Sequence, residues 1–250
     1  MITQYKFKLA ASTEYIQPNL AYRLYAWLLD RLSSEEAAKF HAPETSQLNQ
    51  YISRDIWTVN LLGETAANAV GKILENVSEI ELDVFTLSLN KLSCETIQGA
   101  ESLLLLGQKH AHSLTRLDFR SPTSFKSGGR YMIYPREELL IQSLVNRWNE
   151  CFPEYTLSDE EALAELQSGI HIVDYRLRTC RYRLKGVSIP AFVGDIALEA
   201  RLPIVLRDIW NSLLCFAKYR GVGIKTTLGM GGAEITTDDK MRRITRFYNE

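Results

Sequence analysis

Apolar and polar residues alternate over residues 2–12, in the pattern of a β-strand with one buried face. A helical pattern follows over residues 19–41, where Leu20, Leu24 and Leu28 recur at the spacing of one helix face. Further elements of strand, strand, helix and strand character are predicted at 48–54, 56–63, 64–77 and 80–89. This order, strand–helix–strand–strand–helix–strand, is that of the ferredoxin-like unit.

The same order repeats in the second half of the chain. Strands are predicted at 114–120, 170–185, 191–200 and 225–237, and helices at 136–152 and 203–219. Residues 97–113 are less regular, and residues 121–135 are rich in loop-forming residues. We therefore expect an α+β protein with two ferredoxin-like domains, residues 1–113 with a linker region at 97–113, and residues 114–250. The two halves show no repeat of residue identity.

The composition is ordinary for a globular protein, with 46% hydrophobic residues, 24% charged residues and a formal net charge of −1. No apolar run approaches the ~20 residues that a membrane span needs, and the first twelve residues lack the layout of a signal peptide. The four cysteines are far apart and favour neither a zinc site nor a disulfide framework. We expect a cytoplasmic protein that uses no metal or cofactor.

Basic residues concentrate in the sequence YRLRTCRYRLK at 175–185, which has five cations, two tyrosines and no acid. Arg176 and Arg178 are expected on one strand face, and Arg181, Arg183 and Lys185 on the next after a one-residue slip. A basic strand with interleaved aromatic residues suits a single-stranded nucleic acid, whose backbone attracts cations and whose bases stack. The alternative is a solvated sheet face that discourages edge pairing.

A glycine-rich loop, GVGIKTTLGMGG at 221–232, follows the last predicted helix. The residue before Lys225 is Ile224, so the P-loop pattern is not met. A dinucleotide-binding fingerprint follows a strand and opens a helix, whereas this loop follows a helix and precedes a strand. Two readings remain: a helix C-cap with a turn and a bulged strand, or a loop that lies flat against the phosphates of a polynucleotide.

The helix followed by YRGVGIKTTLGMGG resembles the C-terminus of the CRISPR-associated repeat endoribonucleases, the Cas-six family. LDFRSPTSFKSGGRYMIYP at 117–135, LLIQSLVNRWNE at 139–150 and FVGDIALEA at 192–200 are similar to that family as well, as is FH at 40–41. The resemblance covers residues 114–235 most strongly and the N-terminal half more loosely.

The resemblance implies tandem ferredoxin-like domains, binding of CRISPR repeat RNA, and one metal-independent cut per repeat. In that reaction the ribose 2′-oxygen attacks the adjacent phosphorus and leaves a 2′,3′-cyclic phosphate and a 5′-hydroxyl, which DNA cannot do. Other CRISPR effector subunits and a second copy of the chain are further partners that it leaves open. The residues expected to bind RNA are Arg176, Arg178, Arg181, Arg183, Lys185, Arg220, Gly221, Gly223, Lys225, Thr226, Gly229, Gly231 and Gly232.

The resemblance also implies the catalytic residues. His41 lies where the family commonly places its histidine, and imidazole suits proton transfer near neutral pH. Tyr22 and Tyr25 are candidates for a tyrosine that the family supplies from its first helix. The family's lysine shortly after the histidine is absent, so only Lys39 or Arg54 could supply that charge.

Three other histidines and a basic tail complete the candidates. His110 and His112 could share a strand face and hold a metal, but a linker or surface role is favoured; His171 is expected to be structural. The tail MRRITRF at 241–247 could contact RNA or lie in solvent. A non-catalytic RNA-binding subunit of an interference complex stays the main alternative. A tandem RNA-recognition protein outside CRISPR systems is disfavoured, because no aromatic RNP motif is present.

Overall fold

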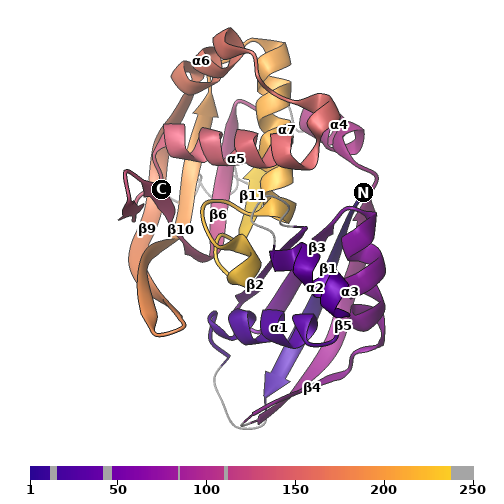
Figure 1. The fold of residues 1–250 in the computed structure, drawn as a ribbon. Coiled ribbons are helices and arrows are strands. Elements are labelled where there is room, and N and C mark those ends of the chain that lie inside the picture. The colour runs from indigo at the N-terminus through magenta and orange to yellow at the C-terminus, as the bar shows by residue number, and fades with distance from the viewer. Residues whose placement is uncertain (12–15, 42–46, 84, 110–111, 238–250) are drawn as a thin grey trace, which may run out of the picture.

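The computed structural model describes residues 1–11, 16–41, 47–83, 85–109 and 112–237. Its two large β-sheets lie one above the other in Figure 1, each with its own helices. The elements of the first part are β1 (Ile2–Ala11), α1 (Leu20–Leu29), α2 (Ser34–His41), β2 (Leu48–Ser53), β3 (Ile56–Leu62), α3 (Glu64–Asn76), β4 (Glu79–Leu82) and β5 (Phe85–Ile97).

The first sheet has the strand order β2-β3-β1-β5-β4, with every neighbouring pair antiparallel. Helices α1 and α3 cover one face, because alternate residues of β1 are apolar and need a partner layer. Phe7 and Trp57, at a ring separation of 5.7 Å, pack there with Leu24 and Val70. Apart from the small β4 hairpin strand, this is the ferredoxin-like order.

Helix α4 (Ala100–Lys109) connects this part to the second sheet. The remaining elements are β6 (Leu114–Thr123), β7 (Phe125–Ser127), β8 (Arg130–Met132), α5 (Glu137–Cys151), the 3₁₀ turn η1 (Pro153–Tyr155), α6 (Glu160–Gly169), β9 (Ile170–Leu184), β10 (Val187–Ala200), α7 (Ile204–Arg220), the 3₁₀ turn η2 (Thr226–Leu228) and β11 (Ala233–Thr237).

The second sheet has the order β11-β6-β10-β9, again antiparallel throughout. Helices α5 and α7 cross one face of it (Figure 1), and Phe119, Phe192, Trp148 and Phe216 form the core between them. The edge strand β9 and its partner β10 form a long hairpin that reaches beyond the helices toward the first sheet (Figure 1). The predicted tandem ferredoxin-like fold is confirmed.

The single helix predicted over 19–41 is wrong: the structure has two helices. Ser33 and Glu36 form a capping box, in which the Ser33 N–H donates to Glu36 Oε2 at 3.0 Å and the Glu36 N–H donates to Ser33 Oγ at 3.3 Å. This motif satisfies the free N–H groups of a new helix N-terminus, so α2 begins separately from α1.

Two further segments differ from expectation. The strand predicted at 80–89 is a hairpin of β4 and the longer β5. Residues 100–109 of the irregular region are helical, because α4 has an apolar face that packs on α7; Gly107 allows the close approach to Ser212. Among the described residues no helix is long and apolar enough to cross a bilayer.

The uncovered face of the first sheet meets the C-terminal part of the chain. Tyr51 of β2 is buried against Gly232, and Lys6 of β1 pairs with Glu234 of β11 at 3.1 Å. These contacts place the glycine-rich loop between the two sheets, beside β2 and α1 (Figure 1).

Candidate functional site

The five glycines of the loop at 221–232 are buried, and each allows another part of the chain to approach closely. A Cβ on Gly221 would meet the side chain of Asn49, one on Gly229 would meet Ala21 and the Tyr182 hydroxyl, and one on Gly232 would meet the ring of Tyr51. The glycines are therefore packed within the protein, and their expected contact with RNA phosphates stays a prediction. Their number follows from close packing between the two parts of the molecule.

Backbone N–H groups of the loop donate hydrogen bonds to acceptors within the protein. Gly223 donates to Ser143 Oγ at 3.0 Å, Gly231 to the carbonyl of Pro122 at 3.0 Å, and Gly232 to Ser121 Oγ at 2.9 Å. The exposed side chain of the loop is that of Lys225, which adopts the left-handed conformation with φ 54°. Of the loop residues expected to bind RNA, Lys225 is thus the one whose side chain is exposed.

Two arginines hold the loop in place, half-buried Arg147 and buried Arg220. Arg147 of α5 donates to Thr226 Oγ1 at 3.0 Å, to the carbonyl of Arg220 at 3.3 Å and to the carbonyl of Gly223. The side chain of Arg220 is only 4% exposed and donates to Glu150 at 3.2 Å and to Thr226 at 3.4 Å. Arg220 and Thr226, both expected to bind RNA, are thus buried and bonded within the protein.

Buried Gln50 joins the loop to the first helix. Its amide nitrogen donates to the carbonyl of Ala21 in α1 at 2.8 Å and to the carbonyl of Thr227 at 2.9 Å. Its oxygen accepts a hydrogen bond of 2.8 Å from the Trp57 indole. The buried Gln50 amide therefore fixes the position of the loop relative to α1 through hydrogen bonds to both.

Tyr25 of α1 holds the end of α2. Its hydroxyl donates to the carbonyl of Phe40 at 3.1 Å, and burial raises its pKa above the usual value. The Tyr25 side chain therefore joins α1 to the residue that precedes His41, the last residue of α2. The side chain of His41 lies outside the described residues.

The remaining catalytic candidates are spread apart. Lys39 pairs with Glu35 of the same helix at 3.3 Å, and Arg54 is exposed in the turn between β2 and β3 with φ 59°. Tyr22 is half-buried, and the ammonium of Lys185 lies 5.5 Å from its ring centroid. Lys185 comes from the turn of the β9–β10 hairpin, so the structure brings a cation of the second sheet to the first helix.

The basic residues of β9 divide between two faces. The register with β10 is continuous from Asp174 to Leu184, and the one-residue slip lies at Val173, before the basic residues rather than among them. Arg176 and Arg178 therefore share the face that carries Asp195, and Arg176 pairs with that carboxylate at 3.2 Å. The opposite face carries Arg181 and Arg183, both exposed.

The two other histidines that the structure describes lie on different segments. His112 precedes β6 and His171 lies in β9 opposite Glu199, both half-buried, whereas His110 and the tail at 241–247 lie outside the described residues. Within the described part of the chain, no group of three or more His, Cys, Asp or Glu side chains is arranged to hold a metal ion.

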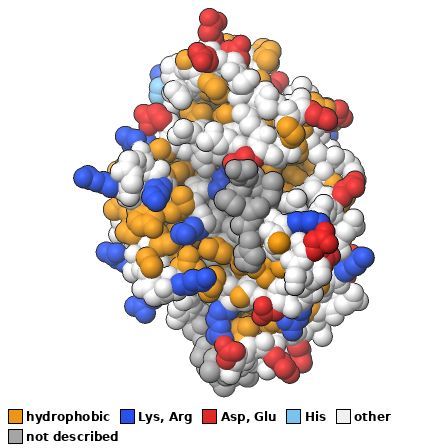
Figure 2. Space-filling view, viewed as in Figure 1, with side chains coloured by type: hydrophobic (Ala, Val, Ile, Leu, Met, Phe, Trp, Pro, Cys, Tyr) orange, Lys and Arg blue, Asp and Glu red, His pale blue; other side chains and the backbone are white. Residues whose placement is uncertain are grey.

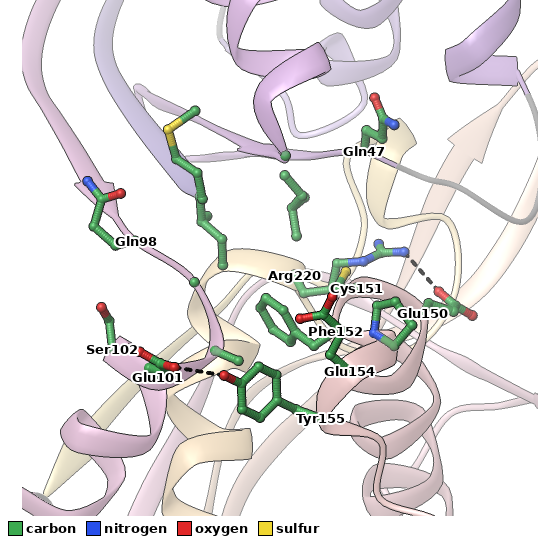
Figure 3. Close-up of a pocket in the computed structure, with 17 residues that line it drawn as sticks. Gln47, Gln98, Glu101, Ser102, Glu150, Cys151, Phe152, Glu154, Tyr155 and Arg220 are labelled. Carbon is green, nitrogen blue, oxygen red and sulfur yellow. Dashed lines mark hydrogen bonds and ion pairs between the residues drawn. The ribbon is translucent and has the colours of Figure 1, made fainter.

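A cavity of about 620 Å³ lies between the two parts of the molecule, apart from α1 and the hairpin turn. Figure 3 shows Glu101, Glu150 and Glu154 around it, with Tyr155 donating to Glu101 at 2.8 Å and Arg220 to Glu150. Three carboxylates against one arginine, which is already paired, make this cavity unfavourable for a polyanion.

The fold defines the chain as a tandem ferredoxin-like protein, and comparisons with known proteins agree. The family model described as CRISPR-associated endoribonuclease Cas6 matches residues 117–233. The CRISPR-associated endoribonuclease Cas6 of Streptococcus thermophilus is 30% identical over 226 residues, which cover 87% of this chain and 91% of that protein. The Mycobacterium tuberculosis relative of the same name is 26% identical over 120 residues, 48% of this chain and 38% of its own length.

Solved structures give the same fold. A Cas6 product complex aligns with a TM-score of 0.75 at 22% identity and covers 95% of this chain and all of that one. A Thermus thermophilus Cas6 aligns with a TM-score of 0.72 at 20% identity, over 94% of this chain and 98% of that one. The chain belongs to the Cas6 family of CRISPR-associated endoribonucleases, as the resemblance predicted.

Gln50 and Arg147 are parts of this site that the sequence reasoning missed. Both lie in elements that also carry core residues, LNQYIS at 48–53 and LLIQSLVNRW at 139–148. A polar residue within a predicted buried element signals a partner elsewhere. The sequence alone does not identify that partner.

Proposed function

We propose that this protein cleaves CRISPR precursor RNA within its repeats, by a reaction that needs no metal ion. The observation that carries the proposal is the 30% identity to the Streptococcus thermophilus enzyme over 87% of the chain. Structural neighbours described as a Cas6 product complex and a Cas6 substrate mimic complex support RNA as the ligand.

In the proposed reaction the 2′-oxygen of one ribose attacks the neighbouring phosphorus and displaces the 5′-oxygen of the next nucleotide. A 2′,3′-cyclic phosphate and a 5′-hydroxyl are formed, and no water is consumed. The 2′-hydroxyl loses its proton to a base, and the 5′-oxygen gains one from an acid. Cations stabilise the negative charge that the phosphorane oxygens gain in the transition state.

We assign proton transfer to His41, at the end of α2. Tyr25 supports this position, since its hydroxyl bonds to the carbonyl of the preceding residue and its side chain is buried. Tyr25 then acts as a positioning residue, and Tyr22 is the tyrosine proposed to contact the RNA.

Lys185 is proposed as the cation that the family's missing lysine would supply. Lys39 is held by Glu35, whereas Lys185 sits over the ring of Tyr22 from the hairpin turn. The positive charge therefore reaches α1 from the second sheet instead of following the histidine in sequence. Lys225, Arg181 and Arg183 are exposed and can hold phosphates of the same strand.

Single-turnover cleavage of repeat RNA from the host's own arrays, in EDTA, tests these assignments. Wild type is expected to cut once per repeat. His41→Ala is expected to lower the rate about 10²- to 10⁴-fold, the range for a lost general acid or base. Lys185→Ala is expected to lower the rate and Lys185→Arg to restore part of it, while Lys72→Ala, an exposed lysine of α3, serves as the matched control.

Tight binding by wild type without a cut would contradict the proposal and indicate a non-catalytic RNA-binding subunit. Wild-type rates in His41→Ala would contradict the histidine assignment alone. Equal rates in Lys185→Ala and Lys72→Ala would contradict the role of Lys185.

A further inference from the structure

Two tyrosines form an exposed aromatic pair on the second part of the molecule. Tyr134 follows β8 and Tyr175 lies in β9; their ring centroids are 5.7 Å apart with the planes nearly perpendicular. Tyr175 is 56% exposed and Tyr134 is 42% exposed. Neighbouring Ile133 is exposed as well. Two exposed rings in contact with each other are a candidate contact site, whereas single exposed apolar residues are common on any protein surface.

The pair is held rigidly. Tyr175 pairs with Ile196 in the middle of the β9–β10 ladder, and Ile196 is buried in the core. Tyr134 is followed by buried Pro135 and then by the start of α5. Main chain that is already ordered loses little conformational entropy when a flat partner stacks on the rings that it carries.

Cations lie farther along the same strand and in the neighbouring hairpin, and the carboxylate of Glu137 lies near Tyr134. Arg181 and Arg183 lie on the same face of β9 as Tyr175, and Arg130 and Lys126 are exposed in the β7–β8 hairpin. No carboxylate of the described residues lies within ion-pair distance of these four cations. Figure 2 shows hydrophobic side chains with Lys and Arg side chains around them at the side of this face where Figure 1 places β9.

We propose that Tyr134 and Tyr175 form a stacking platform for an unpaired base of the bound RNA, outside the cleavage site. The inference rests on the proposed function and deepens it. Exposed rings with cations along one strand face fit a single strand, because stacking holds the base while arginine side chains hold the backbone. A duplex does not fit, because its bases already stack on one another.

The platform has a defined distance from the site on α1. Tyr175 lies ten residues before Lys185 on one continuous strand after the bulge, which is about 33 Å at ~3.3 Å per residue. A stacked single strand advances about 3.4 Å per nucleotide. A straight stacked strand covers that length with about ten nucleotides, so we expect the base held by the platform to lie about ten nucleotides from the one at Lys185.

Equilibrium binding tests the platform. The RNA carries a 2′-deoxy sugar at the cut site, so that it is not cleaved, and single-stranded flanks on both sides of the repeat. Tyr175→Ala and Tyr134→Ala are each expected to weaken binding about 5- to 150-fold, the range for one lost base stack. Tyr175→Phe is expected to bind like wild type, because the ring stays. Tyr155→Ala removes an exposed tyrosine beside α4 and is expected to change nothing.

An abasic scan identifies the nucleotide. One abasic position about ten nucleotides from the cut is expected to weaken wild type as strongly as Tyr175→Ala does, and to add nothing in that variant. Near-wild-type affinity of Tyr175→Ala and Tyr134→Ala would overturn the platform and leave the patch as a protein contact. Equal losses in Tyr175→Phe and Tyr175→Ala would overturn it too.

Failure of the stacking platform can be distinguished from failure of the proposed function. If wild type cuts repeat RNA and the alanine variants bind it normally, only the platform is wrong. If wild type neither binds nor cuts the RNA, the proposed function itself is wrong. The melting temperature of each variant, measured by circular dichroism, shows that folding is unchanged.

Discussion

Gly232 gives the sharpest test of how the two parts of the molecule are joined. The Tyr51 ring of β2 packs directly on this glycine, and a Cβ there would lie 2.5 and 2.6 Å from Tyr51 Cδ1 and Cδ2. Carbon atoms in van der Waals contact are about 3.5–4.0 Å apart, so the ring or the loop must shift by about 1 Å. The ring cannot turn away freely, because Tyr51 is only 2% exposed.

Gly232→Ala is therefore expected to lower the free energy of unfolding by about 1–3 kcal/mol, the usual cost of overpacking a buried site. Backbone strain adds little, since Gly232 does not have the positive φ of its neighbour Gly231. Urea denaturation followed by tryptophan fluorescence measures the change. Gly71→Ala is the control: it adds the same methyl at a buried site in helix α3, where the nearest atom is 3.3 Å away and alanine favours the helix.

A double-mutant cycle isolates the collision. Tyr51→Ala removes the ring, so Gly232→Ala should cost less than about 0.5 kcal/mol in that background. If Gly232→Ala lowers the free energy of unfolding equally in both backgrounds, the collision with Tyr51 is not the cause. A change of less than about 0.5 kcal/mol in the wild-type background would also contradict the prediction.

Three further predictions concern single elements. Ser33→Ala removes the capping box of α2 and should lower the free energy of unfolding by about 0.5–2 kcal/mol by urea denaturation, with no change for exposed Ser168→Ala. Gln50→Leu leaves the Trp57 indole and the carbonyls of Ala21 and Thr227 without their hydrogen-bond partner. The urea midpoint and the cleavage rate should therefore both fall. An unchanged cleavage rate would contradict the inference that Gln50 positions α1. Burial raises the pKa of Cys215 from 9.0 to about 11, so this thiol stabilises the fold below pH 9, and at most about 2.7 kcal/mol of the free energy of unfolding is lost as the pH rises through 11. Cys215→Ala should therefore make the free energy of unfolding less dependent on pH in this range. The same pH dependence in wild type and variant would contradict the prediction.

The ferredoxin-like order of the main strands and helices in both halves could be predicted from sequence, because periods of two and about 3.6 residues are local properties. The break between α1 and α2 was visible as well, in the spacing of Ser33 and Glu36, although the continuous apolar pattern masked it. The purpose of the glycines was not predictable, because what a Cβ at Gly221 or Gly232 would touch depends on β2, some 170 residues away along the chain.

The site was predictable in its parts but not in its arrangement. The basic character of β9 was evident, whereas the position of the bulge at Val173 decides which face each arginine takes, and no sequence signal marks it. The sequence also shows no lysine soon after His41, which leaves the charge unassigned. Only the fold brings Lys185 to Tyr22, because the hairpin turn reaches α1 across the space between the sheets.

The most direct test of the proposed chemistry is the mass of the cleavage products. Repeat RNA is incubated with wild-type protein in EDTA, beside the same RNA with a single 2′-deoxy sugar 5′ to the cut. We expect wild-type protein to cut the RNA once, giving an upstream product with the mass of a 2′,3′-cyclic phosphate and a downstream product with a 5′-hydroxyl. We expect the deoxy substrate to stay intact. Cleavage of the deoxy substrate at the same position, or a requirement for a divalent metal ion, would contradict the proposed chemistry.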